Sequence, residues 1–177
     1  MNHAETMIED KISLDALDIR LLEALQRNAR STFAELAARV GLSAPTVHER
    51  VKRLETRGFV RRYSAQLDGK LLGFGLVAFV SCFTSADTEY DEFTERVGAL
   101  PEVSEVHSVA GEETFLLKVT TRSTTHLDEF LSRLKHIPGV QRTKTTIVLS
   151  TTFERGGIAL TTAEKPHSRR LRSVGRA

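Results

Sequence analysis

The segment between residues 43 and 63 carries side chains of the types and spacing that bind nucleic acid. It holds six Lys or Arg residues against two acidic residues, in a chain with a formal net charge of +2. Lys and Arg side chains bind phosphate oxygens, whereas Thr, His and Glu side chains can pair with base edges in the major groove. A helix over this segment would bring such side chains together, and it is a candidate DNA-binding surface.

The helical period divides this segment into an inner and an outer face. At about 100° per residue, Val47, Val51 and Leu54 share the inner face. Arg50 lies near the edge of that face, so an internal ion pair with a helix carboxylate and a phosphate contact are both open for it. The candidate DNA-contacting residues are Ser43, Pro45, Thr46, His48, Glu49, Arg50, Lys52 and Arg53.

Different roles are expected along the outer face. Thr46, His48 and Glu49 come early in the helix and would read base edges, with Glu49 accepting from a cytosine amino group. Lys52 and Arg53 would meet phosphates and add affinity that does not depend on sequence. The alternative is that this face is only a solvated helix surface.

Three amphipathic helices are expected to position this face. In the first, leucines recur at helical intervals, at positions 14, 17, 21, 22 and 25. Ser31 or Thr32 caps the second, with Glu35 as the capping-box partner. Ser43 caps the third, and Gly58 ends it.

The second and third helices have the spacing of a helix-turn-helix. A small residue in one helix allows close packing, a glycine makes the turn, and a β-branched residue of the next helix fills the core. Ala37, Gly41 and Val47 hold these places at intervals of four and six residues. The spacing therefore predicts a helix-turn-helix, winged-helix-like domain at residues 14–62.

The second half of the chain alternates between strand and helix patterns. Glycines at positions 69, 73 and 75 indicate a linker, so we expect a hinge strand and linker over residues 63–75. The predicted elements beyond it are strand 76–83, helix 89–99, strand 103–110, strand 115–121, helix 125–136 and strand 140–152. This βαββαβ order predicts a ferredoxin-like domain at residues 76–153 and an α+β chain overall.

Composition and motifs exclude several classes of protein. The 40% hydrophobic and 27% charged residues are typical of a folded globular chain. The longest apolar run, residues 76–83, is shorter than the roughly 20 residues that cross a bilayer, so we expect no membrane partner. The polar, acidic start lacks the pattern of a secretory signal and favours the cytoplasm. Cys82 lies in that apolar run and is expected in the core.

No pattern in the chain indicates catalysis or a cofactor. Neither a glycine-rich phosphate loop nor a nucleophile motif is present in the sequence. His107 and His126 have no second ligand at metal spacing, so we interpret them as surface or sheet residues. We therefore expect no catalytic residues, no metal and no cofactor.

Residues 14–152 resemble the leucine-responsive/asparagine (Lrp/AsnC) family of prokaryotic transcription regulators. Three stretches carry the likeness: the whole helix-turn-helix segment, then "LPEVSEVHSVAGEETFLLKV" and "IPGVQRTKTTIVLST". The resemblance implies a DNA-binding domain joined by a hinge to a domain of the RAM/ACT-like type. It also implies a homodimer that assembles into tetramers or octamers and binds a small effector, typically an amino acid.

The family places its effector beside the turn between the second and third strands of the second domain. Here the resemblance implies the effector-binding residues Leu100, Pro101, Val103, Gly111, Glu112, Glu113 and Thr114. Many members carry Asp where this chain has Thr114 and an aromatic residue where it has Glu113. The two adjacent glutamates would suit a basic amino acid, but a solvated hairpin turn or a neighbouring subunit are equally open.

Two functions from different classes follow. The first is a sequence-specific, effector-modulated regulator of amino-acid metabolism that binds double-stranded DNA. The second is an architectural protein that wraps DNA with little sequence preference, helped by a basic tail. We expect that tail to be mobile and to comprise residues 154–177, of which 156–177 hold five basic residues against one acidic. We also expect a flexible N-terminus at residues 1–13.

Overall fold

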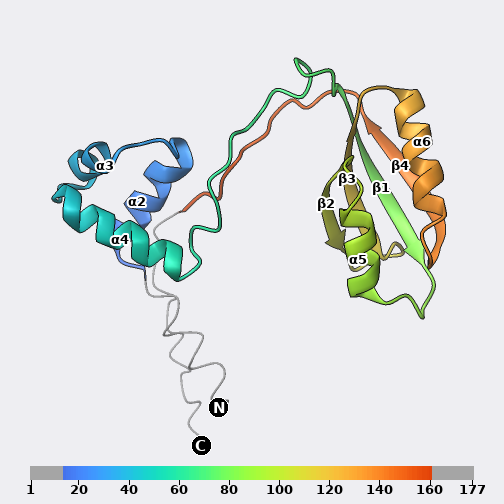
Figure 1. The fold of residues 1–177 in the computed structure, drawn as a ribbon, viewed down its shortest axis with the longest axis horizontal. Coiled ribbons are helices and arrows are strands. Elements are labelled where there is room, and N and C mark those ends of the chain that lie inside the picture. The colour runs from blue at the N-terminus through green and yellow to red at the C-terminus, as the bar shows by residue number, and fades with distance from the viewer. Residues whose placement is uncertain (1–13, 161–177) are drawn as a thin grey trace, which may run out of the picture. The chain divides into compact units, whose positions relative to one another are not determined.

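The computed structural model describes residues 14–160, which form two compact units (Figure 1). A helical unit comprises residues 14–65 and 155–160, and a sheet unit comprises residues 66–154. Each unit has its own hydrophobic core. The expected flexible N-terminus at residues 1–13, and residues 161–177 of the expected basic tail, lie outside the described residues.

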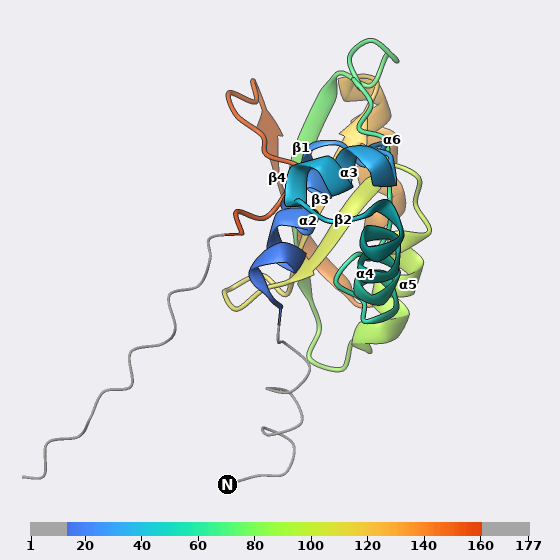
Figure 2. The same cartoon turned by 90° about the vertical axis from the view of Figure 1, so that its left-hand side faces the viewer.

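Three helices make up the helical unit: α2 (Ala16–Arg27), α3 (Phe33–Val40) and α4 (Ala44–Thr56). Figure 2 turns them toward the viewer. Asp15 caps α2, and the predicted capping box of Thr32 and Glu35 begins α3. The hydroxyl of Ser43 accepts from the N–H of Thr46 at the start of α4, as predicted. The helix starts are therefore set by local side-chain chemistry.

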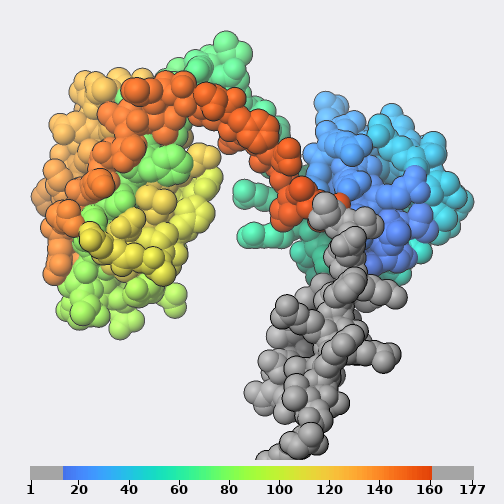
Figure 3. Space-filling view, turned by 180° about the vertical axis from the view of Figure 1, so that it is seen from behind, coloured from blue at the N-terminus to red at the C-terminus, as the bar shows by residue number. Residues whose placement is uncertain are grey.

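The last described residues return to the helical unit. Leu160 packs against its core, and the N–H of Ile158 donates to Oε1 of Gln26 at 2.7 Å. Figure 3 shows this stretch, at the orange-red end of the colour scale, against the blue helices. Contacts with α2 thus begin within the segment that was expected to be a mobile tail.

The sheet unit has the predicted βαββαβ order. Its elements are β1 (Leu76–Thr84), α5 (Tyr90–Gly98), β2 (Val103–Ser108), β3 (Phe115–Thr121), α6 (Thr124–Lys135) and β4 (Val140–Val148). The strands lie in the order β2-β3-β1-β4, and each neighbouring pair is antiparallel. This is the arrangement of the ferredoxin-like fold, and the predicted fold class is confirmed.

Helices α5 and α6 pack on the same face of the sheet. Alternate residues of β1 and β3 are buried beneath them, as the two-residue period of a strand requires. Phe93 of α5 stacks on Phe115 of β3, with 4.3 Å between ring centroids. Cys82 is fully buried in this core as predicted, and burial raises the pKa of its thiol to about 12.

Some predicted strands are shorter or absent. Residues 61–75 contain no strand, so the expected hinge strand is missing from this single chain. An extended segment becomes a strand only when its backbone finds a ladder partner. β2 ends at Ser108 and β4 at Val148, before the predicted residues 110 and 152, and β4 stops where its pairing with β1 stops, at Val77. Among the described residues, no helix has the length and apolar content needed to cross a membrane.

Candidate functional site

Helix α4 turns its predicted polar face to solvent. Val47 and Leu54 are fully buried and Val51 is 2% exposed, so the inner face fixes the helix to the unit. Seven of the eight candidate DNA-contacting residues are exposed, Arg50 being the exception: Ser43, Pro45, Thr46, His48, Glu49, Lys52 and Arg53. The structure therefore brings these seven together on one accessible surface.

The turn before α4 has the geometry that the spacing predicted. Gly41 has a φ of 77°, in the left-handed region that favours glycine, and its N–H donates to the carbonyl of Ala37 at 2.9 Å. Ala37 is 6% exposed and Val47 is fully buried in the same core. The predicted small residue, turn glycine and core residue of a helix-turn-helix are each found in place.

Arg50 and Arg53 bind a buried carboxylate of α2. Nη1 of Arg50 lies 2.6 Å from Oδ2 of Asp15 and 2.8 Å from Oδ1 of Asp18. Nη2 of Arg53 lies 3.2 Å from each carboxylate oxygen of Asp18. Of the two roles that the sequence left open for Arg50, the structure shows the internal ion pair, which joins α4 to α2.

The same contacts shift two pKa values. Hydrogen bonds to Asp15 and Asp18 raise the pKa of Arg50 above its usual value. Burial acts to raise the pKa of Asp15, but hydrogen bonds from the N–H of Asp18 and from Arg50 outweigh it, and that pKa is lowered. Arg50 is therefore held as a cation against α2, whereas Arg53, whose side chain is 50% exposed, also faces solvent.

Phe33, the first residue of α3, adjoins the candidate surface but was not among the predicted site residues. The residue is 41% exposed, and its ring meets the imidazole of His48 edge-on, with 4.8 Å between centroids and 74° between planes. Nδ1 of His48 lies 3.5 Å from Oε1 of Glu49. Phe33 directly follows the helix cap, at a position that does not face the core. An aromatic residue at such a position is the sequence signal that could have predicted this contact.

The candidate effector turn, residues 109–114, is tied to the end of β1. The N–H of Thr114 donates to the carbonyl of Cys82 at 2.9 Å. The hydroxyl of Thr114 accepts from Thr84 twice, from the N–H at 3.3 Å and from the hydroxyl at 3.1 Å. Thr114 therefore serves the fold of the turn, and its hydroxyl is engaged within the chain.

The tip of this turn is open. Gly111 and Glu112 are exposed and Glu113 is half-buried. A Cβ built on Gly111 would meet only the carboxylate group of Glu113, at an ordinary contact distance of 3.6 Å. The turn itself does not require glycine at this position, and the backbone at its tip is accessible to a ligand.

Leu100, Pro101 and Val103 lie at the opposite end of β2 from that turn. β2 runs from Val103 to Ser108, which is about 16 Å at 3.3 Å per residue. Leu100 and Val103 pack against the sheet core, and Pro101 is exposed. Within one chain the structure does not bring the two groups of candidate effector residues together, and a site containing both requires a second copy of the chain.

Glu102, between Pro101 and Val103, is a buried charge that the sequence did not reveal. It is 6% exposed, and its Oε1 accepts from Nε2 of His126 at 2.9 Å and from Nη2 of Arg133. Burial acts to raise the pKa of Glu102, but the hydrogen bonds from Arg133 and His126 outweigh it and the pKa is lowered. His126, interpreted from sequence as a surface or sheet residue, thus belongs to an ionic cluster on α6.

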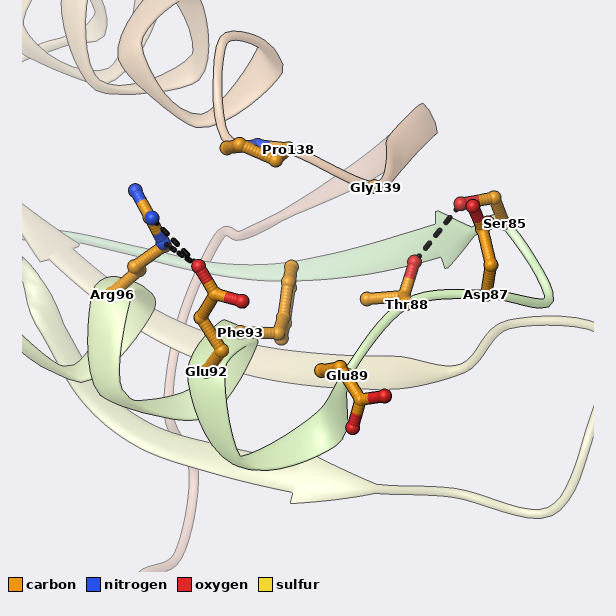
Figure 4. A pocket seen from close by; sticks show the side chains of 9 residues that line it. All are labelled: Ser85, Asp87, Thr88, Glu89, Glu92, Phe93, Arg96, Pro138 and Gly139. Carbon is orange, nitrogen blue, oxygen red and sulfur yellow. Dashed lines mark hydrogen bonds and ion pairs between the residues drawn. The ribbon is translucent and has the colours of Figure 1, made fainter.

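A hollow of about 170 Å³ in the sheet unit contains none of the predicted site residues (Figure 4). Its lining pairs with itself: the hydroxyls of Ser85 and Thr88 lie 3.0 Å apart, and Arg96 donates to Glu92 at 3.0 and 2.6 Å. Gly139 borders it with a φ of 90°, and a Cβ there would overlap Thr88. These pairings engage polar groups that a ligand would need, so we assign the hollow no function.

Two family models match the chain, and each lies mainly in one of its two units. The AsnC-type helix-turn-helix domain covers residues 14–55, and the Lrp/AsnC ligand binding domain covers residues 77–158. The HTH-type transcriptional regulator LrpA of Mycobacterium tuberculosis is 38% identical over 141 residues, which span 80% of this chain and 93% of that protein. The matched domains and this relative are those of DNA-binding transcriptional regulators and not of enzymes.

Solved structures agree with the sequence matches. A transcriptional regulator of Neisseria meningitidis in complex with L-methionine has a TM-score of 0.80 at 32% identity, covering 84% of this chain and 97% of that chain. A feast or famine regulatory protein of M. tuberculosis, also complexed with L-methionine, has a TM-score of 0.77 at 37% identity, covering 82% and 99%. The chain therefore belongs to the Lrp/AsnC family of transcriptional regulators.

Proposed function

We propose that this regulator binds specific DNA sequences, controls amino-acid metabolism, and responds to an amino acid that modulates its DNA binding or its assembly. The observation that carries the DNA-binding part is the division of α4 into two faces. Its apolar side is locked into the core by Val47, Val51 and Leu54, while its polar side is exposed. A helix held in this way presents a fixed pattern of side chains to the major groove.

On this proposal the exposed face of α4 has two parts. Thr46, His48 and Glu49 lie in the first half of the helix and read base edges, where hydrogen-bonding groups differ between base pairs. Lys52 and Arg53 lie in the second half and meet the phosphate backbone. Arg53 would meet the phosphate while it keeps its internal contact, since it binds Asp18 and its side chain is half exposed.

Replacing Lys52 with alanine tests the DNA-binding part. The variant should weaken binding to every duplex, and the slope of log affinity against log salt should fall by about 0.9, the value for one phosphate contact. Fluorescence anisotropy at several salt concentrations measures both. Lys135→Ala is the matched control, since Lys135 is an exposed lysine in the last turn of α6. Equal slopes for the wild type and Lys52→Ala would remove Lys52 from the interface.

The effector part rests on the β2–β3 turn and on the relatives. Two similar structures hold L-methionine, which supports an amino acid as ligand here. Glu112 and Glu113 are carboxylates that can accept from an α-ammonium group, and the open backbone at Gly111 can approach a carboxylate. Leu100, Pro101 and Val103 would join this site only from another copy of the chain.

A thermal-shift series with the twenty amino acids tests the effector part. A ligand that binds only the folded state raises the unfolding temperature, and the rise grows with the logarithm of its concentration above Kd. We expect one or a few amino acids to stabilise the full chain, and Gly111→Val to abolish that shift while leaving DNA affinity within about twofold. If Gly111→Val responds like the wild type to every active amino acid, the site lies elsewhere.

We also infer that the open face of the sheet joins two copies of the chain. Helices α5 and α6 both pack on one face, and the other presents Phe79, which is 37% exposed, beside the half-buried Val77 and Leu116. Antiparallel sheets that carry apolar side chains on both faces bury the second face against a partner. Sedimentation equilibrium of the full chain measures whether dimers, and then tetramers or octamers, form.

A further inference from the structure

Phe33 is aromatic at a position where the fold does not require an aromatic residue. Phe33 is 41% exposed, whereas the core residues of the same helix, Leu36, Ala37 and Val40, are at most 6% exposed. The backbone N–H groups at the start of α3 are already engaged by the capping box of Thr32 and Glu35, which lie on either side of Phe33. Neither the core nor the helix start explains the ring, and its described ring contact is with His48 of α4.

The imidazole of His48 has two neighbours, one on α3 and one on α4. The ring of Phe33 meets it edge-on at 4.8 Å, and Oε1 of Glu49 lies 3.5 Å from its Nδ1. Edge-to-face aromatic pairs prefer one relative orientation, so this contact limits the rotation of the imidazole. Among the described residues, Nε2 of His48 has no hydrogen-bond partner and is free to meet another molecule.

This arrangement defines which base groups the histidine can bind. A carboxylate beside Nδ1 favours a proton on that nitrogen, which leaves Nε2 of the neutral ring as a hydrogen-bond acceptor. In the major groove the donors are the amino groups of adenine and cytosine. A fixed Nε2 acceptor therefore discriminates these two bases from guanine and thymine, whereas a freely rotating ring does so less well.

We propose that Phe33, which lies outside the recognition helix, is a specificity-determining residue that acts by holding His48 in its base-reading orientation. This inference rests on the proposed function, because it assumes that the outer face of α4 reads bases. Phe33 is a positioning residue here: it need not touch the DNA, and its effect passes through His48. The proposal therefore predicts coupling between the two side chains.

Selection of binding sites from a randomised duplex pool tests the proposal with the full chain. The variants are Phe33→Leu, Phe33→Tyr, His48→Ala and the double variant Phe33→Leu/His48→Ala. Tyr90→Leu is the matched control, since Tyr90 is a half-exposed aromatic of the sheet unit that also contacts another ring. Thermal unfolding and affinity for a random-sequence duplex are measured in parallel.

We expect Phe33→Leu to lose about twofold to tenfold in preference for adenine or cytosine at one position of the site, the range that an aromatic pair contributes. His48→Ala should relax the same position, and the double variant should relax it no further than His48→Ala. Phe33→Tyr should keep the wild-type preference. For Phe33→Leu and Phe33→Tyr, the affinity for a random-sequence duplex and the unfolding temperature should stay close to wild type.

Three results would overturn the proposal. In the first, Phe33→Leu selects the same sites as the wild type. In the second, its effect adds to that of His48→Ala or falls at another position, which makes Phe33 an independent contact. In the third, Phe33→Leu lowers the unfolding temperature and weakens all duplexes equally. A wild-type chain that selects no sequence would instead refute the proposed function, so the two failures are distinguishable.

Discussion

The helical unit and the sheet unit each bury a carboxylate beside arginine, and they satisfy it to different degrees. Asp18 of α2 is 2% exposed, and both of its oxygens accept hydrogen bonds from Arg50 and Arg53 of α4. Glu102 is 6% exposed, and only its Oε1 is engaged, by two side chains of α6. Its Oε2 is buried without a hydrogen-bond partner among the described residues.

The difference indicates what each cluster contributes. A buried charge costs free energy unless hydrogen bonds and opposite charges compensate it, and an unpaired oxygen keeps part of that cost. Asp18 is compensated at both oxygens, so its cluster can act as a firm lock between α2 and α4. Oε2 of Glu102 is not compensated in this way, so the contacts of Glu102 with α6 should contribute less to stability.

Replacing Asp18 with alanine should give the largest loss. It leaves Arg53 without its carboxylate and Arg50 with only Asp15, and we expect a cost of about 2–3 kcal/mol in the free energy of unfolding. This is below the roughly 3–5 kcal/mol of a fully buried pair, because both guanidinium groups keep contact with water. Urea denaturation, with hydrogen exchange of the α2 and α4 amides, measures the loss and its place.

Asp15→Ala is the matched variant for this lock. Asp15 caps α2 and binds Arg50, but its side chain is 50% exposed, so we expect the loss of a cap, about 1 kcal/mol. DNA affinity should fall more for Asp18→Ala than for Asp15→Ala, since the recognition helix loses more of its support. An Asp18→Ala variant as stable as the wild type would contradict the lock.

Local signals in the sequence predicted the helical unit well. The capping box at Thr32, the cap at Ser43 and the left-handed glycine at Gly41 depend on residues close in sequence, and each was found. The ion pairs of Asp18 join residues more than thirty positions apart. Residue type and helical period alone cannot select such partners, and for that reason Arg50 had two open roles.

The candidate site was less predictable than the fold. The outer face of α4 follows from the helical period, but the Phe33 contact depends on how α3 and α4 cross. The effector residues were taken from a resemblance that involves several subunits, and β2 separates Val103 from Gly111 in one chain. The predicted hinge strand is absent for a related reason. A strand requires a hydrogen-bonding partner strand, which the hydrophobic periodicity of a sequence does not reveal.

Glu102→Gln should have a smaller effect than Asp18→Ala. The amide keeps an acceptor for His126 and Arg133 but loses the charge, and we expect a cost of about 1 kcal/mol at neutral pH. Because the pKa of Glu102 is lowered in the folded state, its contribution is present above the usual value of 4.5 and is lost as the pH falls through the lower folded value. The difference from wild type should therefore shrink below about pH 4.5.

Hydrogen exchange of the β2 and α6 amides measures this difference within the sheet unit. Arg133→Gln removes the cation instead of the anion and leaves Glu102 buried with less compensation, so it should cost more than Glu102→Gln. The opposite order would mean that the carboxylate is well compensated despite its unpaired oxygen, and the contrast with Asp18 would disappear.

The exposed carboxylate of Glu55 should contribute the least to stability of the three carboxylates compared. The hydroxyl of Tyr63 donates to Oε1 of Glu55 at 2.7 Å, and the Tyr63 residue is 48% exposed. Tyr63→Phe should cost about 0.5 kcal/mol, because water competes for both groups.

Burial and then Glu55 raise the pKa of Tyr63 to about 12 from its usual 10.0, so the contribution is present below pH 10 and is lost as the pH rises toward 12. A tyrosinate absorbance titration measures this pKa, and the Tyr63→Phe variant identifies the transition that belongs to Tyr63. A Tyr63 transition near pH 10 would show that even this contact is open to solvent, which would leave burial, and not the presence of a partner, as the condition for a carboxylate to stabilise this protein.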